Sequence, residues 1–321
     1  MRIQRLLLVL AATAMLGLAA CGDDEESGGG GAASESSEEL TGSIRIDGSS
    51  TVFPFAQAAA ELFEEEQGGV KITVGQSGTG GGFEKFCAGE TDISDASRPI
   101  DEEEEVPICE ENAVEFGEVQ IANDGIAIAT NKGLTIECMT TDQLKALWEP
   151  KSKVASYSDI DPSFPGQKVA LFGPGTDSGT FEFFTEEITG EEGAQRTDYE
   201  ASEDDNQLVT GVAGTEGGLG YFGLSYFEQN TDKLNGVQVD SGGGCVAPSA
   251  ETVQDGSYTP LSRPLFMYPS KEAMAKPHVK AFMDFIVANQ QAIAEAAQIV
   301  PLTEEQATEA QSSLSSLEGG A

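Results

Sequence analysis

The stretch Val169 to Phe184, VALFGPGTDSGTFEFF, decides the fold of this 321-residue chain. Val169 to Phe172 predicts a short buried strand, and the Gly-Pro-Gly that follows predicts a turn. Asp177 or Ser178 can cap a helix whose apolar residues recur at helical spacing until Gly190 ends it. Free backbone N–H groups and the positive end of a helix dipole converge at such a turn, which therefore favours an anion site.

The chain repeats this order of strand, polar turn and helix twice more. Ile44 to Ile46 predicts a strand that leads through DGSSTVFP, residues 47–54, into a helix. Val70 to Val74 predicts the next strand, which the glycine-rich turn 75–82 joins to a short helix near Phe83 to Cys87. Strands that alternate with helices indicate an α/β fold with mainly parallel sheets, and ligands of such sheets bind at the carboxyl ends of the strands.

The rest of the chain supplies further elements of both kinds. Thr91 to Pro99 predicts a strand that ends in Asp95, Ser97 and Arg98, and the acidic run Asp101 to Glu105 predicts a solvated helix face. Further strands are expected at Val119 to Thr130, Gly217 to Tyr226 and Tyr258 to Tyr268, and helices at Thr140 to Trp148, Gln207 to Ala213 and His278 to Gln298, with at best a short helix and a frayed tail in Thr303 to Ala321.

The net charge of −38, from 55 acidic and 17 basic residues, limits the class of partner. Nucleic acids are excluded because phosphate backbones are bound by neutralising Lys and Arg. A small anion remains compatible with the sequence if local dipoles hold it, since the long-range field opposes its approach.

The N-terminus predicts export and a lipid anchor. Residues 1–20 combine two arginines with an apolar run, as in a signal peptide, and Leu-Ala-Ala-Cys ending at Cys21 resembles a bacterial lipobox. We therefore expect cleavage before Cys21 and lipid attachment to its thiol; a plain signal peptide or an uncleaved anchor is the alternative. Gly22 to Gly42 is acidic and rich in Gly and Ser, so residues 21–42 are expected to be a lipidated flexible tether at the extracytoplasmic face of the membrane.

Four cysteines remain in the exported chain, namely Cys87, Cys109, Cys138 and Cys245. An even set in an exported protein predicts two disulfides, and four cysteines allow three pairings. No CxxC spacing occurs and His278 is the only histidine, so neither a metal nor a cofactor is expected.

Enzyme signatures are weak throughout the chain. The polar turns lack the GxSxG of a nucleophile elbow, no Walker sequence occurs, and a serine triad would have to use His278. Gly218, Gly220 and Gly223 fit GxGxxG, but no strand precedes them. An exported phosphoester hydrolase and a lipid-anchored adhesin or sensor are kept as alternatives.

Five motifs in one order point to a family. DGSSTVFP, SGTGGGFEKF, ASRP, GTDSGTF and GYFG together resemble the phosphate-binding proteins of phosphate ABC transporters, the PstS family, over Ser43 to about Gln298. The resemblance implies the type II periplasmic-binding-protein fold, in which two α/β lobes close over one phosphate and deliver it to the permease; a monomer is expected. The strands that cross between lobes would fall near Gln120 to Gly125 and Tyr258 to Arg263. Lobe I would then comprise residues 43–121 and 259–321, and lobe II residues 122–258, and sulfate or molybdate is the alternative ligand.

The resemblance also implies the site residues. Some family members place an Asp where this chain has Ser97 and an Arg where it has Pro174, so Arg98 is expected to supply the positive charge. Near neutral pH phosphate carries a P–OH that sulfate lacks, so an acceptor is needed as well; Asp95 is the first candidate, with Asp47 and Asp177 in reserve. The expected phosphate-binding residues are Ser50, Thr51, Val52, Ser77, Thr79, Asp95, Ser97, Arg98, Ser178, Gly179 and Thr180.

The two lobes also favour one disulfide pairing. A crosslink between lobes would impede closure, so each disulfide is expected inside one lobe. This predicts the pairs Cys87–Cys109 and Cys138–Cys245.

Overall fold

The structure, a computed structural model, describes residues 40–318. The expected signal peptide, the lipid site at Cys21 and the tether up to residue 39 lie outside the described residues. The tether prediction is wrong at its end, because Gly42 begins the first strand and pairs with Val70. Leu40 packs against the hydrophobic core. This burial orders the end of the segment that its Gly- and Ser-rich composition predicted to be flexible.

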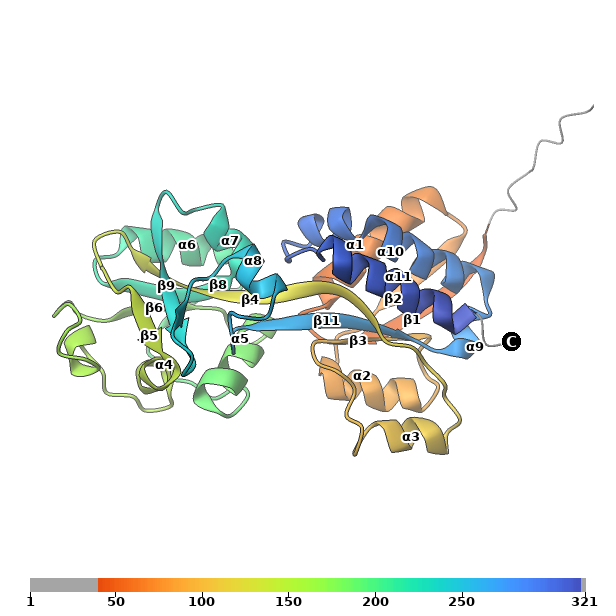
Figure 1. The fold of residues 1–321 in the computed structure, drawn as a ribbon, viewed down its shortest axis with the longest axis horizontal. Coiled ribbons are helices and arrows are strands. Elements are labelled where there is room, and N and C mark those ends of the chain that lie inside the picture. Colours follow the sequence, from red (N-terminus) through yellow and green to blue (C-terminus); the bar gives the residue numbers. More distant parts are fainter. Residues whose placement is uncertain (1–39, 319–321) are drawn as a thin grey trace, which may run out of the picture. The chain divides into compact units, whose positions relative to one another are not determined.

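Strands and helices alternate along the described chain (Figure 1). The strands are β1 Gly42–Gly48, β2 Val70–Val74, β3 Ile93–Ala96, β4 Val119–Asn131, β5 Cys138–Thr140, β6 Ala170–Gly173, β7 Glu200–Ala201, β8 Gly218–Gly223, β9 Leu234–Asp240, β10 Cys245–Val246 and β11 Ser262–Pro269. The helices are α1 Phe53–Glu66, α2 Gly78–Cys87, α3 Val106–Glu111, α4 Thr141–Trp148, η1 Tyr157–Asp159, α5 Gly179–Phe184, η2 Thr185–Thr189, α6 Asp205–Gly214, α7 Leu224–Glu228, α8 Ala250–Gln254, α9 Lys271–Met274, α10 Pro277–Ala296 and α11 Glu304–Glu318.

The described strands form one curled sheet flanked by helices. Eight of them follow the order β2-β1-β3-β11-β4-β8-β6-β7, and β9 pairs with β4, β5 and β10 beside this path. Pairing is parallel within β2-β1-β3 and within β8-β6-β7, and it becomes antiparallel where β11 and β4 join the two groups. Figure 1 shows β4 and β11 running side by side from one group of elements to the other. The predicted α/β class is confirmed, and its parallel strands place the polar turns after β1, β2 and β6.

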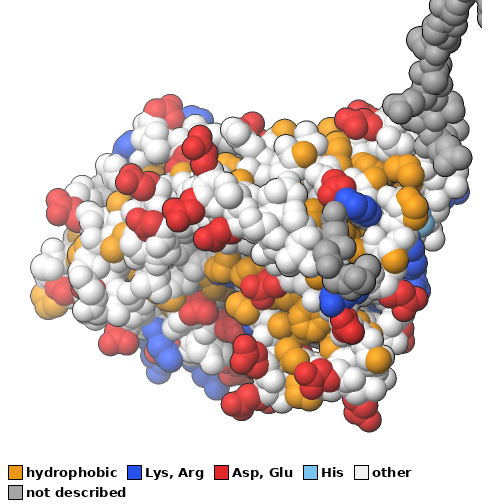
Figure 2. All heavy atoms as spheres, turned by 45° about the vertical axis from the view of Figure 1, so that its right-hand side comes forward, with side chains coloured by type: hydrophobic (Ala, Val, Ile, Leu, Met, Phe, Trp, Pro, Cys, Tyr) orange, Lys and Arg blue, Asp and Glu red, His pale blue; other side chains and the backbone are white. Residues whose placement is uncertain are grey.

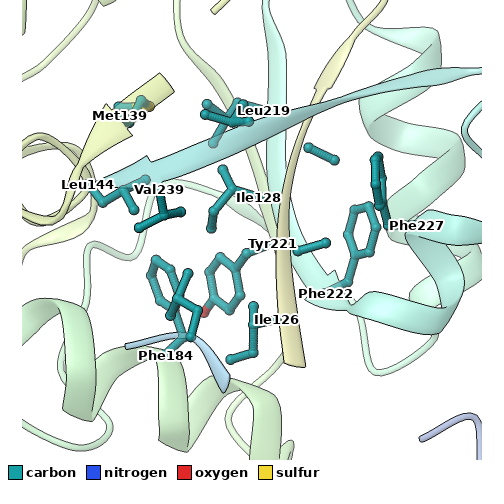
Figure 3. Packing of buried hydrophobic residues seen from close by; sticks show 14 of the residues in the cluster. Ile126, Ile128, Met139, Leu144, Phe184, Leu219, Tyr221, Phe222, Phe227 and Val239 are labelled. Carbon is teal, nitrogen blue, oxygen red and sulfur yellow. The ribbon is translucent and has the colours of Figure 1, made fainter. Parts of the chain in front are cut away.

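Two large clusters of buried apolar residues stabilise the two ends of this sheet. One lies around β4, β8 and β9, where the rings of Phe184 and Tyr221 stack with centroids 3.7 Å apart (Figure 3). The other packs β1 and α1 against α10, with Phe63 edge-on to Phe282. The lobe boundaries themselves stay a prediction.

Both predicted disulfides are confirmed. Cys87–Cys109 joins α2 to α3, and Cys138–Cys245 joins β5 to β10. Each therefore connects elements on one side of the β4 and β11 pair, so that neither ties the two groups of strands together.

Several boundaries differ from the sequence predictions because tertiary contacts override local signals. Helix α2 begins at Gly78, so most of the glycine-rich turn is helical, and a Cβ at Gly82 would lie 2.5 Å from the Cα of Gly48. Asp101 to Glu105 forms a turn before α3 instead of a helix face, because Asp101 accepts hydrogen bonds from two backbone N–H groups and folds the run locally.

Strand β8 and the C-terminal segment also differ from the sequence predictions. Strand β8 ends at Gly223, and α7 takes up the rest of the expected strand, with Leu224 buried on its inner side. The C-terminal helix α11 has 15 residues, because Ala310 and Leu314 bury against the second cluster. Of the helices that the structure describes, none is long and apolar enough to cross a membrane.

Candidate anion-binding cleft

A cleft of about 700 Å³ lies where the ends of several elements meet. The starts of α1 and α2, the residues after β3, α5 with η2, and the start of β11 contribute to its walls. The lining side chains that bear on the argument are Ser49, Ser50, Thr51, Ser77, Thr79, Ser97, Arg98, Glu182, Phe183, Glu186, Glu187, Glu192 and Arg263.

The first turn places two hydroxyl groups in the cleft. Ser49 shapes this turn, because its hydroxyl oxygen accepts the backbone N–H of Thr51 at 3.2 Å and its carbonyl accepts that of Phe53 at 3.0 Å. Ser50 and Thr51 line the cleft as expected, whereas Val52 is fully buried in the core and its side chain faces away from the cleft. Any role of Val52 would therefore rest on its backbone.

The second turn is held by hydrogen bonds within the cleft wall. Thr79 Oγ1 lies 3.0 Å from Ser97 Oγ and accepts the Ser97 backbone N–H at 3.2 Å. The hydroxyl of Ser77 donates to the carboxylate of Asp47, which also accepts from Lys85 at 2.6 Å. Burial raises the pKa of Asp47, but the hydrogen bonds from Lys85 and Ser77 outweigh it and lower that pKa overall. Asp47 is thus occupied in positioning the turn.

The third turn, around Ser178 to Thr180, packs against the first turn and does not line the cleft. Ser178 caps α5, because its hydroxyl oxygen accepts the Thr180 backbone N–H at 3.2 Å. A Cβ added at Gly179 would lie 2.4 Å from Thr51 Oγ1 and 2.7 Å from Ser50 Oγ, so the turns approach closely through this glycine. Helix α5 contributes Glu182 and Phe183 to the lining of the cleft. Ser178, Gly179 and Thr180 are not among the described residues that line it.

Arg263 is a cation of the cleft that the sequence analysis missed as a ligand. Its Nη2 donates to Thr51 Oγ1 at 2.6 Å, its Nε lies 3.3 Å from an Asp124 carboxylate oxygen, and its guanidinium sits 3.7 Å from the Phe183 ring centroid. Burial lowers the pKa of Arg263 and Asp124 opposes this, yet an arginine stays charged in proteins. The sequence offered one indication of this role: Arg263 ends the expected second strand that crosses between the lobes, and the chain has few basic residues.

Arg98, the cation that the sequence analysis chose, lines the cleft but is already paired. Two of its nitrogens donate to the Glu105 carboxylate at 2.8 and 2.7 Å, and its side chain is 45% exposed. Both cleft arginines are thus ion-paired, but Arg263 is only 13% exposed and also donates to Thr51, so it is the better placed cation.

Asp95 does not face the cleft, contrary to the expectation. Its side chain is fully buried, and neither carboxylate oxygen has a hydrogen-bond partner in the described residues. Burial, and after it the charge of Asp47, raises the pKa of Asp95 well above its usual range. The expectation relied on Asp95 and Ser97 sharing one strand face, but β3 ends at Ala96, so the alternation stops before Ser97. Asp177, the other reserve acceptor, is exposed and is not among the described residues that line the cleft.

Four glutamates line the cleft on the side of α5 and η2, and the sequence analysis did not select them. The carboxylate of Glu182 accepts a hydrogen bond from Ser50 Oγ at 2.6 Å. Burial raises the pKa of both Glu187 and Glu192. Figure 2 shows acidic side chains scattered over the face in view as well, so the local donors oppose an unfavourable field. Nowhere in residues 40–318 do three His, Cys, Asp or Glu side chains form a group that could hold a metal ion.

Comparison with known proteins places the chain in a family. The family described as the PBP superfamily domain matches residues 33–290. Protein SphX of Synechocystis sp. is 42% identical over 92% of this chain and 84% of its own length. The phosphate-binding protein PstS of Staphylococcus saprophyticus is 38% identical over 87% of this chain and 86% of its own length.

A solved structure agrees with these relatives. The crystal structure of "a possible phosphate binding protein" from Planctomyces limnophilus is 41% identical and superposes with a TM-score of 0.81, covering 87% of this chain and 99% of that one. The chain therefore belongs to the PBP superfamily and, within it, to the PstS family of phosphate-binding proteins.

Proposed function

We propose that this chain captures inorganic phosphate in the cleft and delivers it to the permease of a phosphate ABC transporter on the extracytoplasmic face of the membrane. One observation carries the proposal: hydroxyl groups of Ser50, Thr51, Thr79 and Ser97 and the guanidinium of Arg263 line one cleft. The names and similarity of the relatives support the same ligand. As a member of a family of binding proteins, the chain is not an enzyme.

A cleft lined by neutral hydrogen-bond donors and one buried cation is well suited to bind a tetrahedral oxyanion. Hydrogen bonds to a charged acceptor are short and strong in a cleft that excludes water. Arg263 supplies a cation that Asp124 and Phe183 hold in place. Such preorganised donors lower the cost of binding, which compensates for the repulsive field of the acidic surface. Ser77 and Arg98 complete the proposed wall, and the turn of Ser178, Gly179 and Thr180 supports it from outside the lining, because Gly179 packs against Ser50 and Thr51.

We also propose that β4 and β11 act as the connection between two closing lobes. Residues 43–121 and 259–321 would form one lobe and residues 122–258 the other. Gly179 then forms the point of closest approach, since its missing side chain lets the third turn meet Thr51. The disulfides fit this division, because each lies on one side of the paired strands.

A lipid on Cys21 would hold the protein near the permease. Once the signal peptide 1–20 is removed, the acidic tether that begins at Cys21 would give the chain reach while keeping its effective concentration at the membrane high. Mass spectrometry of the N-terminal peptide of membrane-purified protein tests this anchor: a diacylglyceryl-modified Cys21 supports it, and an unmodified N-terminus contradicts it.

Titration calorimetry of the ligand-free protein with phosphate, sulfate and molybdate tests the ligand. We expect phosphate to bind at least roughly a thousand-fold more tightly than sulfate, near 4 kcal/mol, because sulfate has no proton to donate and faces like charge from the carboxylates that line the cleft. Comparable binding of sulfate or molybdate would mean that the cleft serves another oxyanion. Release of phosphate from a chromogenic phosphoester would instead indicate a hydrolase. Light scattering that gives the mass of one chain would support a monomer.

A further inference from the structure

The segment between α10 and α11, residues 298–303, lies beside the two strands that join the two ends of the sheet; we call it the connector. Its Val300 pairs with Asn123 of β4, since the Asn123 N–H donates to the Val300 carbonyl at 2.8 Å and the Val300 N–H donates to the Asn123 carbonyl at 3.1 Å. On its other side Asn123 is paired with Pro264 of β11. The connector therefore adds a third backbone to β4 and β11 at this point.

Two apolar side chains of the connector enter different hydrophobic clusters. Val300 is buried in the cluster around β4, β8 and β9, whereas Leu302 is buried in the cluster that packs β1 and α1 against α10. These residues are only two positions apart in the chain. The connector thus links the cores at the two ends of the sheet.

Side-chain amides add hydrogen bonds between the connector region and the elements around β8. Gln254 of α8, a helix that lies against β4 (Figure 1), donates its Nε2 to the Pro301 carbonyl at 2.9 Å. Gln306 of α11 donates its Nε2 to the Gln254 carbonyl at 3.2 Å, and Gln229 donates its Nε2 to Gln298 Oε1 at 2.7 Å. All three bonds join residues 122–258 to residues 259–321, so they cross between the proposed lobes.

These bonds are present together with contacts between the two walls of the cleft. Ser50 Oγ donates to Glu182 at 2.6 Å from the opposite wall, and Gly179 packs against Thr51. Rotation of the lobes about β4 and β11 would carry Gln254 away from its position beside the connector, because Leu302 holds the connector in the other core. Opening the cleft would therefore strain or break the bonds across the connector.

We propose that the connector is a third connection between the lobes, which favours the closed cleft and limits how far the ligand-free cleft opens. A contact that is made only in the closed arrangement shifts the population toward it, and a larger closed population binds the ligand more tightly. This inference rests on the proposed function for its closing lobes. It assigns to Gln254 and the connector an effect on phosphate affinity although neither lines the cleft.

The test compares Gln254→Ala with Gln290→Ala. Gln290 lies on α10, and its Oε1 accepts the Leu302 N–H at 3.2 Å, so it holds the connector from within its own proposed lobe. Each change removes one amide hydrogen bond to the connector, but only the Gln254 bond crosses between the lobes. Small-angle X-ray scattering without and with phosphate, and titration calorimetry with phosphate, are run on the unmodified chain and both variants. Circular dichroism checks that each is folded.

In Gln254→Ala we expect a larger radius of gyration without phosphate and an unchanged one with phosphate bound. Phosphate should bind roughly threefold to tenfold more weakly, the usual effect of one hydrogen bond, whereas Gln290→Ala should leave affinity within about twofold. Gln229→Ala, at an exposed position, should also expand the ligand-free chain and keeps the test decisive if Gln254→Ala does not fold.

Three results would overturn the inference. Folded cross-lobe variants with unchanged dimensions and affinity would show that the bonds only add stability, and equal expansion in Gln290→Ala would show that the crossing between lobes is irrelevant. Tighter phosphate binding in Gln254→Ala would show that the connector favours the open cleft. Failure of the unmodified chain to bind phosphate would instead overturn the proposed function, while scattering of the ligand-free chains would still report on the connector.

Discussion

Replacement of Arg263 by Met tests the cation of the cleft. The change removes the charge, the bond to Thr51 Oγ1 and the ion pair with Asp124, and keeps an apolar chain to pack on Phe183. A hydrogen bond to a charged group is worth about 1.5–3 kcal/mol, so phosphate should bind roughly tenfold to a hundredfold more weakly, as titration calorimetry would show.

The same replacement should lower the free energy of unfolding. Breaking a buried ion pair by removing one partner costs about 3–5 kcal/mol, and we expect the lower end because both side chains remain 13% exposed. The double variant Arg263→Met with Asp124→Asn removes the unpaired carboxylate, so it should regain most of the stability in urea unfolding without regaining affinity. This double variant separates a binding defect from a folding defect.

Arg98→Met is the matched control for the loss of a cleft arginine. Arg98 also lines the cleft, but its side chain is 45% exposed and paired with Glu105, and exposed pairs are typically worth about 0–1 kcal/mol. We expect affinity to change less than about fivefold. If Arg263→Met binds phosphate as the unmodified chain does and Arg98→Met does not, the assignment of the cation is wrong.

Three other sets of substitutions test the polar turns, the disulfides and the buried acid. Thr51→Ala should weaken phosphate binding by about 1.5–3 kcal/mol in calorimetry, whereas Ser178→Ala, the loss of a helix cap, should cost about 1 kcal/mol of stability and little affinity. Replacing Cys138 and Cys245 by Ser opens a loop with a sequence separation of 107 and should lower the unfolding free energy by about 4 kcal/mol, with phosphate still bound when the protein is folded. Burial raises the pKa of Asp95, so the folded state keeps a proton that the unfolded state releases above about pH 4, and stability falls as pH rises through that window. Asp95→Asn should therefore match the unmodified chain near pH 4 and exceed its stability at pH 7; urea curves that diverge in the opposite direction would contradict the buried state of Asp95.

The sequence by itself determined the order of elements and the class of site. The repeated pattern of apolar strand, polar turn and capped helix is a local signal, and β1, β2, β6 and the helices after them follow it. Ser178 was recognisable as a cap and the even cysteine count as two disulfides, because both depend on residue types and neighbours along the chain. The polar turns with few basic residues likewise indicated an anion held by neutral donors.

The tertiary structure alone decided which side chains reach the cleft. Arg263 and Glu182 stand 81 positions apart, and their meeting at the first turn depends on how β11 and α5 pack, which no spacing along the chain reports. Asp95 and Ser97 looked equivalent by strand alternation, yet β3 ends between them and only Ser97 lines the cleft. Local patterns specify which elements form, whereas burial and charge at a site depend on contacts between residues far apart in the chain, and those contacts exist only once the elements have packed.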